Sequence, residues 1–320
     1  MGRLVYDSTE TLIYDPVAAN RTATRAALYT LGFRHIETVA TLDAFVNSVR
    51  RRPPDLAMCE AQGADTELCK IIQELRQGAA GFNPFIVIIV TAWEKSGALV
   101  SRVVNSGADD LLLRPFSTTL LGQRIEAHVE RRKSFVVTSD YVGPDRRKDG
   151  ARASNVELFS PPNSLKLKAK DRLSADEVNA RLDSELKDAR DKLHSEKLRR
   201  DSFQISILWR LLQEHISSAA ASADLDKIMQ LAKGVAARAR DTEVDAAVQW
   251  CDSVIAAVEG LQAGVDRNAA MHLLGHASLS LNHVFHPEKS TEEILTEIDA
   301  TVAIIRARND AVAPASAAAG

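Results

Sequence analysis

The chain has 320 residues, of which 45% are hydrophobic and 26% are charged, and its formal net charge is -3. This balance is typical of a soluble globular protein with room for two domains, and it excludes a strongly basic nucleic-acid-binding chain. Three scattered cysteines exclude a disulfide framework, and the absence of a signal peptide and of an apolar run near ~20 residues leads us to expect a cytoplasmic protein.

Residues 1–133 form the first predicted domain, in which short apolar runs alternate with amphipathic stretches. The run at 85–90 is apolar at every position, as expected of a strand buried on both faces. Five β-α units in series predict an α/β fold with a doubly wound, five-stranded parallel sheet that has helices on both faces. The predicted strands are residues 11–14, 36–39, 56–59, 85–90 and 111–113, and the predicted helices are 20–31, 42–51, 67–76, 97–105 and 118–132.

The rest of the chain changes character twice. Residues 134–172 are rich in Pro, Gly, Ser and basic residues, which predicts a basic linker. Residues 173–310 predict an all-α domain, a helical bundle whose charged first part has an apolar stripe typical of a coiled coil. Residues 311–320 are small and predict a disordered tail. The stripe comprises Val178, Leu182, Leu186, Ala189 and Leu193, and the later helices are predicted at 203–217, 224–240, 244–259, 268–285 and 291–308.

Polar side chains follow four of the predicted strands at the point where each strand ends. In an open parallel sheet, ligands bind where the carboxyl ends of the strands meet at a change in strand order. The sequence therefore directs attention to this edge of the sheet. The residues are Tyr14-Asp15 after the first strand, Glu60 after the third, Thr91-Ala92 after the fourth and Arg114-Pro115-Phe116 after the fifth.

Together with Ser106-Gly107-Ala108-Asp109 before the last strand, this order resembles the CheY-like receiver domains of bacterial response regulators. The resemblance covers most of residues 11–133 and implies that the doubly wound sheet is of the flavodoxin/CheY type. It implies an acidic pair that holds Mg²⁺, an aspartate that accepts a phosphoryl group, and a hydroxyl and a lysine that contact the phosphoryl oxygens. It also implies a signalling face at the last strand and helix, near Leu111, Pro115, Phe116 and residues 118–128.

Three of these positions depart from the receiver pattern. Tyr14 stands where one metal-binding carboxylate belongs, Glu60 stands where the phospho-accepting aspartate belongs, and Arg114 replaces the lysine. Thr91 keeps the hydroxyl. Asp15 is the remaining candidate Mg²⁺ ligand, and because Tyr14 replaces the other carboxylate of the pair, we expect no cofactor. The extra methylene of Glu60 moves its carboxylate by roughly 1–1.5 Å, and misplacement on that scale lowers catalytic rates about a hundredfold.

Our hypothesis is that Glu60 and Arg114 form a built-in charge pair that mimics one signalling state, because an arginine can hold a carboxylate through parallel hydrogen bonds. Two alternatives stay open. Glu60 and Asp15 are ordinary polar residues of an inactive docking module, or the chain is an active phosphorelay component with phosphate on Glu60 or on a C-terminal histidine.

The helical half offers histidines as candidates. His272 and His276 are spaced to share one face of a helix, but no third ligand accompanies them, so we expect no zinc site. Either one is also a candidate phosphotransfer histidine, although neither is followed by the Lys-Gly pair of such domains. Gln230, with Lys233-Gly234 after it, resembles that motif but lacks the histidine.

The basic linker provides a third alternative, a nucleotide- or nucleic-acid-binding function. Arg146, Arg147 and Arg152 resemble the arginine cluster that precedes PilZ domains, which bind cyclic di-GMP, but helices follow here in place of a barrel. Lys166, Lys168, Lys170 and Arg172 could contact phosphates, yet no recognition helix or aromatic platform accompanies them, and we expect no nucleic-acid partner.

No catalytic triad, P-loop or dinucleotide fingerprint appears in the sequence. We therefore predict a non-enzymatic regulator of the two-component type that acts through protein–protein contacts. The expected partners are a histidine kinase or a downstream regulator, and a second copy of the chain through the helical domain.

Overall fold

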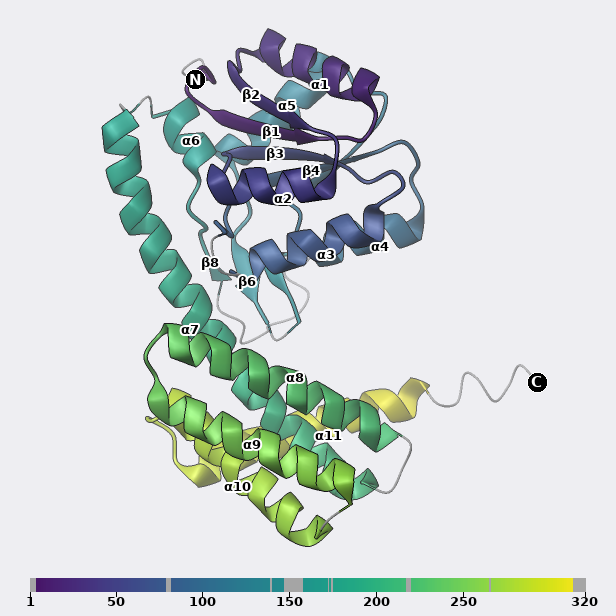
Figure 1. Cartoon of the computed structure of the whole chain (residues 1–320), viewed down its shortest axis with the longest axis vertical. Coiled ribbons are helices and arrows are strands. Elements are labelled where there is room, and N and C mark those ends of the chain that lie inside the picture. Colours follow the sequence, from purple (N-terminus) through teal and green to yellow (C-terminus); the bar gives the residue numbers. More distant parts are fainter. Residues whose placement is uncertain are drawn as a thin grey trace, which may run out of the picture. The chain divides into compact units, whose positions relative to one another are not determined.

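The computed structural model describes residues 4–78, 82–138, 140–146, 158–171, 173, 175–216, 220–264 and 266–312 (Figure 1). The chain forms two compact units, Met1–Leu193 and His194–Gly320. Among the described residues, no helix is long and apolar enough to cross a membrane. Part of the predicted tail, residues 313–320, lies outside the described residues.

The first unit contains a parallel five-stranded sheet with the order β2-β1-β3-β4-β5. This order confirms the predicted doubly wound fold of the flavodoxin/CheY type. The fourth strand begins two residues later than predicted, because Phe85 packs on aromatic rings outside this sheet. The strands are β1 (Glu10–Tyr14), β2 (His35–Val39), β3 (Leu56–Glu60), β4 (Val87–Ala92) and β5 (Asp110–Leu113).

Helices cover both faces of this sheet (Figure 1). One face packs on α2, α3 and α4 through side chains such as Phe45 and Leu68, and the other packs on α1 and α5 through side chains such as Leu28 and Ile125. Helix α1 ends at Gly32, whose φ of 108° is in the left-handed region that glycine adopts without strain. The helices are α1 (Ala18–Leu31), α2 (Leu42–Arg51), α3 (Asp65–Arg76), α4 (Gly97–Ser106) and α5 (Thr118–Glu130).

The stretch predicted as a linker contains regular structure within the first unit. Its three strands form an antiparallel sheet, and its helix buries Leu165 and Ala169 against the apolar face that also holds α1 and α5. The rings of Phe135 and Phe159 pack against Phe85 at about 6 Å between centroids. Strands this short carry too little alternation for a sequence pattern to reveal them. The elements are β6 (Phe135–Val137), β7 (Val142–Pro144), β8 (Leu158–Phe159) and α6 (Ser164–Ala169).

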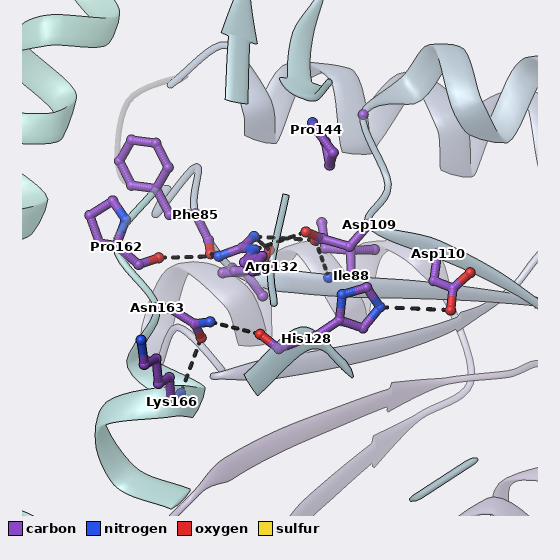
Figure 2. A network of polar contacts seen from close by, with 12 residues as sticks. Phe85, Ile88, Asp109, Asp110, His128, Arg132, Pro144, Pro162, Asn163 and Lys166 are labelled. Carbon is purple, nitrogen blue, oxygen red and sulfur yellow. Dashed lines mark hydrogen bonds and ion pairs between the residues drawn. The ribbon is translucent and has the colours of Figure 1, made fainter. Parts of the chain in front are cut away.

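A buried ionic network joins this stretch to the amino ends of the parallel strands (Figure 2). Asp109 accepts from Arg76 at 2.7 Å and from Arg132 at 2.9 Å, and it also accepts the backbone N–H of Ile88 at 2.8 Å. Both guanidinium groups lie about 5 Å from the centroid of the Phe135 ring. Arg132 donates to the backbone oxygen of Pro162 as well, at 3.1 Å. The network therefore holds strands of both sheets together.

The two arginines change the ionisation of the carboxylate between them. Burial by itself raises the pKa of Asp109, but Arg132 and Arg76 outweigh burial, so that its pKa lies below the usual value. Burial lowers the pKa of Arg76 to about 10, against the opposing effect of Asp109. Asp109 is therefore ionised in the native state.

The second unit is helical. Helix α7 runs without a break through residue 203, where a separate helix was predicted to begin. The hydroxyls of Ser202 and Ser206 donate to backbone carbonyls three and four residues earlier, so these buried polar groups are satisfied within the helix. Asp224 lies inside α8 and pairs with His215 at 2.8 Å. Ser290 caps α11 by accepting the N–H of Glu293. The helices that follow the first unit's sheets are α7 (Ala175–His215), whose residues up to Leu193 belong to the first unit, α8 (Ala220–Asp241), α9 (Asp245–Ala263), α10 (Arg267–Phe285) and α11 (Thr291–Val312).

The apolar stripe predicted to form a coiled coil has contacts within the first unit. Ala189 and Leu193 are buried against the aromatic cluster of Phe85, Phe135 and Phe159. The side chains of Val178 and Leu182 lie outside the described residues. The described part of the stripe is therefore covered by its own chain.

Trp209 packs directly on the backbone of Gly275 in the second unit. A Cβ added at Gly275 would lie 2.6 Å from the Trp209 ring, whereas one at Gly260 would meet Ala270 at an acceptable 3.4 Å. We expect Gly275→Ala to destabilise the bundle by about 1–3 kcal/mol through overpacking. We expect Gly260→Ala to be neutral or stabilising by up to about 1 kcal/mol, because alanine favours the helix. Urea unfolding followed by circular dichroism compares the two, and equal stabilities would contradict this packing.

Candidate functional site

Four side chains meet at the carboxyl ends of the parallel strands. Asp15 follows β1, Glu60 ends β3, Thr91 lies near the end of β4 and Arg114 follows β5. Glu60 and Thr91 are register partners in neighbouring strands. Because β1 and β3 are adjacent while the chain runs through β2 between them, this is the switch point where doubly wound sheets bind ligands.

Both oxygens of the Glu60 carboxylate accept hydrogen bonds from the protein. Oε2 accepts from the Thr91 hydroxyl and from Nε of Arg114, each at 2.8 Å. Oε1 accepts from the backbone N–H of Gln62 at 3.1 Å. The Glu60 side chain is 1% exposed, so these contacts are shielded from water. Charge-assisted hydrogen bonds of this kind are roughly twice as strong as neutral ones.

Arg114 connects Glu60 to the rest of the pocket. Its Nη2 donates to the Thr24 hydroxyl of α1 at 3.0 Å and to Oδ2 of Asp15 at 3.3 Å. The guanidinium also lies 4.9 Å from the centre of the Phe116 ring, within the range of a cation–π contact. The Arg114 guanidinium therefore contacts Thr24 in α1, Asp15 after β1, Glu60 in β3 and Phe116 after β5.

Asp15 and Tyr14 occupy the place of the expected acidic pair. Asp15 is fully buried, and its Oδ1 accepts the backbone N–H of Val17 at 2.8 Å. Burial raises the pKa of Asp15 and the nearby Glu60 raises it further, while the Val17 N–H and Arg114 act in the opposite direction. Tyr14 points into the apolar core, where its ring packs 6.2 Å from that of Phe45. Its phenol supplies no carboxylate to the pocket.

The geometry restricts what Glu60 can do chemically. A carboxylate nucleophile needs a lone pair that is free to attack, and a guanidinium and a hydroxyl both bind the Glu60 oxygen nearest to Arg114. A carboxylate oxygen has two lone pairs, so the single Gln62 N–H restrains Oε1 less than Thr91 and Arg114 restrain Oε2. Glu60 and Arg114 thus form a buried ion pair in which Oε2 is bound by both Arg114 and Thr91.

Sequence reasoning missed two residues at this edge. Thr24 is 1% exposed in α1, and no local sequence signal distinguishes it, because its burial depends on how α1 packs. Trp93 directly follows β4, is 46% exposed, and comes after Ala92, the register partner of Leu113 in β5. Its position directly after Thr91-Ala92, at the end of the predicted fourth strand, is the sequence signal that could have identified Trp93.

The residues of the predicted signalling face lie beside this pocket. Leu111 is partly buried on the face that packs on α2, α3 and α4, Pro115 is exposed, and Phe116 is partly buried beneath Arg114. Leu113 and Leu120, each 37% exposed, add apolar surface in β5 and α5.

The histidines of the helical half do not assemble a metal site. His272 and His276 are exposed on α10, and the His276 ring packs 5.3 Å from Trp250. Within the part of the chain that the structure describes, no cluster of three His, Cys, Asp or Glu side chains could hold a metal ion. Gln230 and Lys233 are exposed on α8.

The basic residues of the predicted linker are largely engaged with the first unit. Lys168 pairs with Asp55 at 2.8 Å, and Lys170 pairs with Glu130. The guanidinium of Arg146 lies 3.6 Å from the centre of the Tyr141 ring. Arg147, Arg152 and Arg172 lie outside the described residues.

No known family model matches the chain, and no curated protein matches it by sequence. Solved structures resemble its N-terminal part. A receiver domain from Bermanella marisrubri is 22% identical with a TM-score of 0.35, covering 39% of this chain and 100% of its own. A CheY-like receiver protein from Methanospirillum hungatei is 19% identical with a TM-score of 0.35, covering 39% and 97%. The chemotaxis protein CheY4 from Vibrio cholerae is 17% identical with a TM-score of 0.34, covering 38% and 98%.

Proposed function

We propose that this chain is a non-enzymatic regulator of two-component signalling whose receiver-type unit works without phosphorylation. The observation that carries the proposal is the Glu60 carboxylate, which is buried and bound by both Thr91 and Arg114. The position that accepts phosphate in receiver domains is thus occupied by a carboxylate that already has its hydroxyl and its cation.

The contacts of Arg114 suggest how the pocket acts on the surface. The same guanidinium that binds Glu60 lies over the ring of Phe116, which belongs to the predicted signalling face. A built-in negative charge at Glu60 therefore holds Phe116 in one position at all times. In this interpretation the unit presents a constant docking surface to its partner.

The partner that this surface fits is another protein. Trp93, Leu113 and Leu120 expose apolar side chains around the pocket, and buried aromatic anchors dominate protein–protein binding energies. We propose a histidine kinase or a downstream regulator as the partner, with the helical unit as a second surface for self-association or partner binding.

A phosphodonor test separates this function from the phosphorelay alternative. We expect the wild-type chain to keep its mass by intact mass spectrometry after incubation with acetyl phosphate and Mg²⁺. The reason is that Thr91 and Arg114, the groups that would contact the phosphoryl oxygens, both already bind Oε2 of Glu60. The double variant Glu60→Asp/Arg114→Lys, which restores a shorter acid and a compact ammonium, is the matched positive control.

Peptide mapping under mild conditions locates any phosphoryl group. Phosphate on Glu60 of the wild-type chain would overturn the proposed function. Phosphate on His272 or His276 would instead favour the phosphotransfer alternative.

A further inference from the structure

The Arg114 guanidinium lies between the two buried carboxylates of the pocket. Its Nε is 2.8 Å from Glu60, and its Nη2 is 3.3 Å from Asp15. We propose that Arg114 is a tethered counter-cation that excludes a divalent metal ion from this pocket. The inference concerns the same pocket as the proposed function and rests on it, and it adds how the pocket is regulated.

The oxygen atoms of the pocket do not fit a magnesium ion. Mg²⁺ requires near-octahedral coordination by oxygen, usually from one or two carboxylates and several waters. Each carboxylate oxygen of Asp15 and Glu60 already accepts from a protein donor, namely the Val17 N–H, the Gln62 N–H, Thr91 or Arg114. A metal ion entering the pocket would have to displace the guanidinium. The resemblance to receiver domains implies a bound Mg²⁺, but the residues present in this pocket do not fit that ion.

Tyr14 removes the third source of negative charge. In place of a carboxylate it contributes a phenol that is buried in the apolar core. Two carboxylates and one guanidinium remain, so Arg114 offsets half of the formal negative charge of the pocket. A divalent ion would add charge and would also lose hydration, which Mg²⁺ resists more strongly than guanidinium does.

Thr24 acts as a positioning residue for this cation. Its hydroxyl accepts from Nη2 of Arg114 at 3.0 Å, and the residue is 1% exposed. Arginine remains charged throughout the accessible pH range, so a buried guanidinium that is held from α1 and β3 stays between the carboxylates. Because Arg114 is part of the chain, a cation occupies the position between the two carboxylates whatever the metal concentration around the protein.

Manganese binding to the full-length chain tests the inference, with electron paramagnetic resonance to count bound Mn²⁺ and Trp93 fluorescence as a local probe. We expect no pocket binding by wild type. Arg114→Ala leaves two buried carboxylates without a cation and should bind Mn²⁺ at least about tenfold more tightly. Saturating Mn²⁺ should raise its melting temperature by about 2–4 °C. Asp15→Asn in the same background should abolish both effects.

Arg114→Gln, which retains a donor for Glu60 without the charge, is tested in parallel in case the alanine variant fails to fold. Wild-type Mn²⁺ binding that is lost in Asp15→Asn would overturn the inference. So would folded Arg114 variants that gain no affinity. Neither result depends on whether acetyl phosphate labels Glu60, so failure here is distinguishable from failure of the proposed function.

Discussion

Asp109→Asn is expected to lower the free energy of unfolding of the first unit by about 3–5 kcal/mol. The variant removes the charge that compensates two buried guanidinium groups. Arg76 is 1% exposed and pairs with Asp109. Arg132 is 4% exposed and pairs with the same carboxylate (Figure 2). Hydrogen exchange of the β4 amides, measured by mass spectrometry, reports on this unit separately from the helical one.

The neighbouring Asp110 provides a matched control. It pairs with Arg124, which is 47% exposed, at 3.4 Å, and it also lies 3.7 Å from Nε2 of His128. Asp110→Asn should change stability by only about 0–1 kcal/mol, because water and salt screen such pairs. Equal effects of the two substitutions would show that the buried network contributes nothing beyond an ordinary surface pair.

Asp109→Asn should also change how the stability of the first unit depends on pH. The native pKa of Asp109 lies below its usual value, so its contribution to the free energy of unfolding is present above the usual pKa. That contribution is lost as the pH falls through the native pKa. Wild type should therefore lose stability towards low pH more steeply than Asp109→Asn.

Arg114→Met is expected to destabilise the first unit by a similar amount, about 3–5 kcal/mol, because it leaves the carboxylates of Glu60 and Asp15 buried without a cation. Adding Glu60→Gln should recover part of this loss. We expect the double-mutant cycle to give a coupling energy of about 0.5–3 kcal/mol between Glu60 and Arg114. The measurement is again exchange of the β4 amides, which include Thr91.

An exposed ion pair is the control for this cycle. Arg51 and Glu37 are 2.9 Å apart, but their side chains are 72% and 39% exposed, so their coupling should not exceed about 1 kcal/mol. Purely additive effects of Glu60→Gln and Arg114→Met would contradict the built-in charge pair. Such additivity would favour the alternative in which Glu60 is an ordinary polar residue at a strand end.

The two ionic clusters lie at opposite ends of one strand. Asp109 accepts the N–H of Ile88 near the start of β4, and the Thr91 hydroxyl donates to Glu60 near its end. Strand β4 is fully buried, so neither end can shift without disturbing the core. The two ionic clusters are therefore joined through one buried strand.

The sequence by itself determined the alternation of strands and helices in the first unit, because periodicity and short turns are local properties of a chain. It also placed Asp15, Glu60, Thr91 and Arg114 at strand ends, which a parallel sheet brings to one edge. It could not place Thr24, since which helical residue faces a pocket depends on how α1 packs. Only the tertiary structure decided how Phe135, Phe159 and Leu193 pack, because they find their partner far away in sequence, at Phe85. Local composition indicated a linker at residues 134–172, but long-range packing produced a second sheet from part of that stretch.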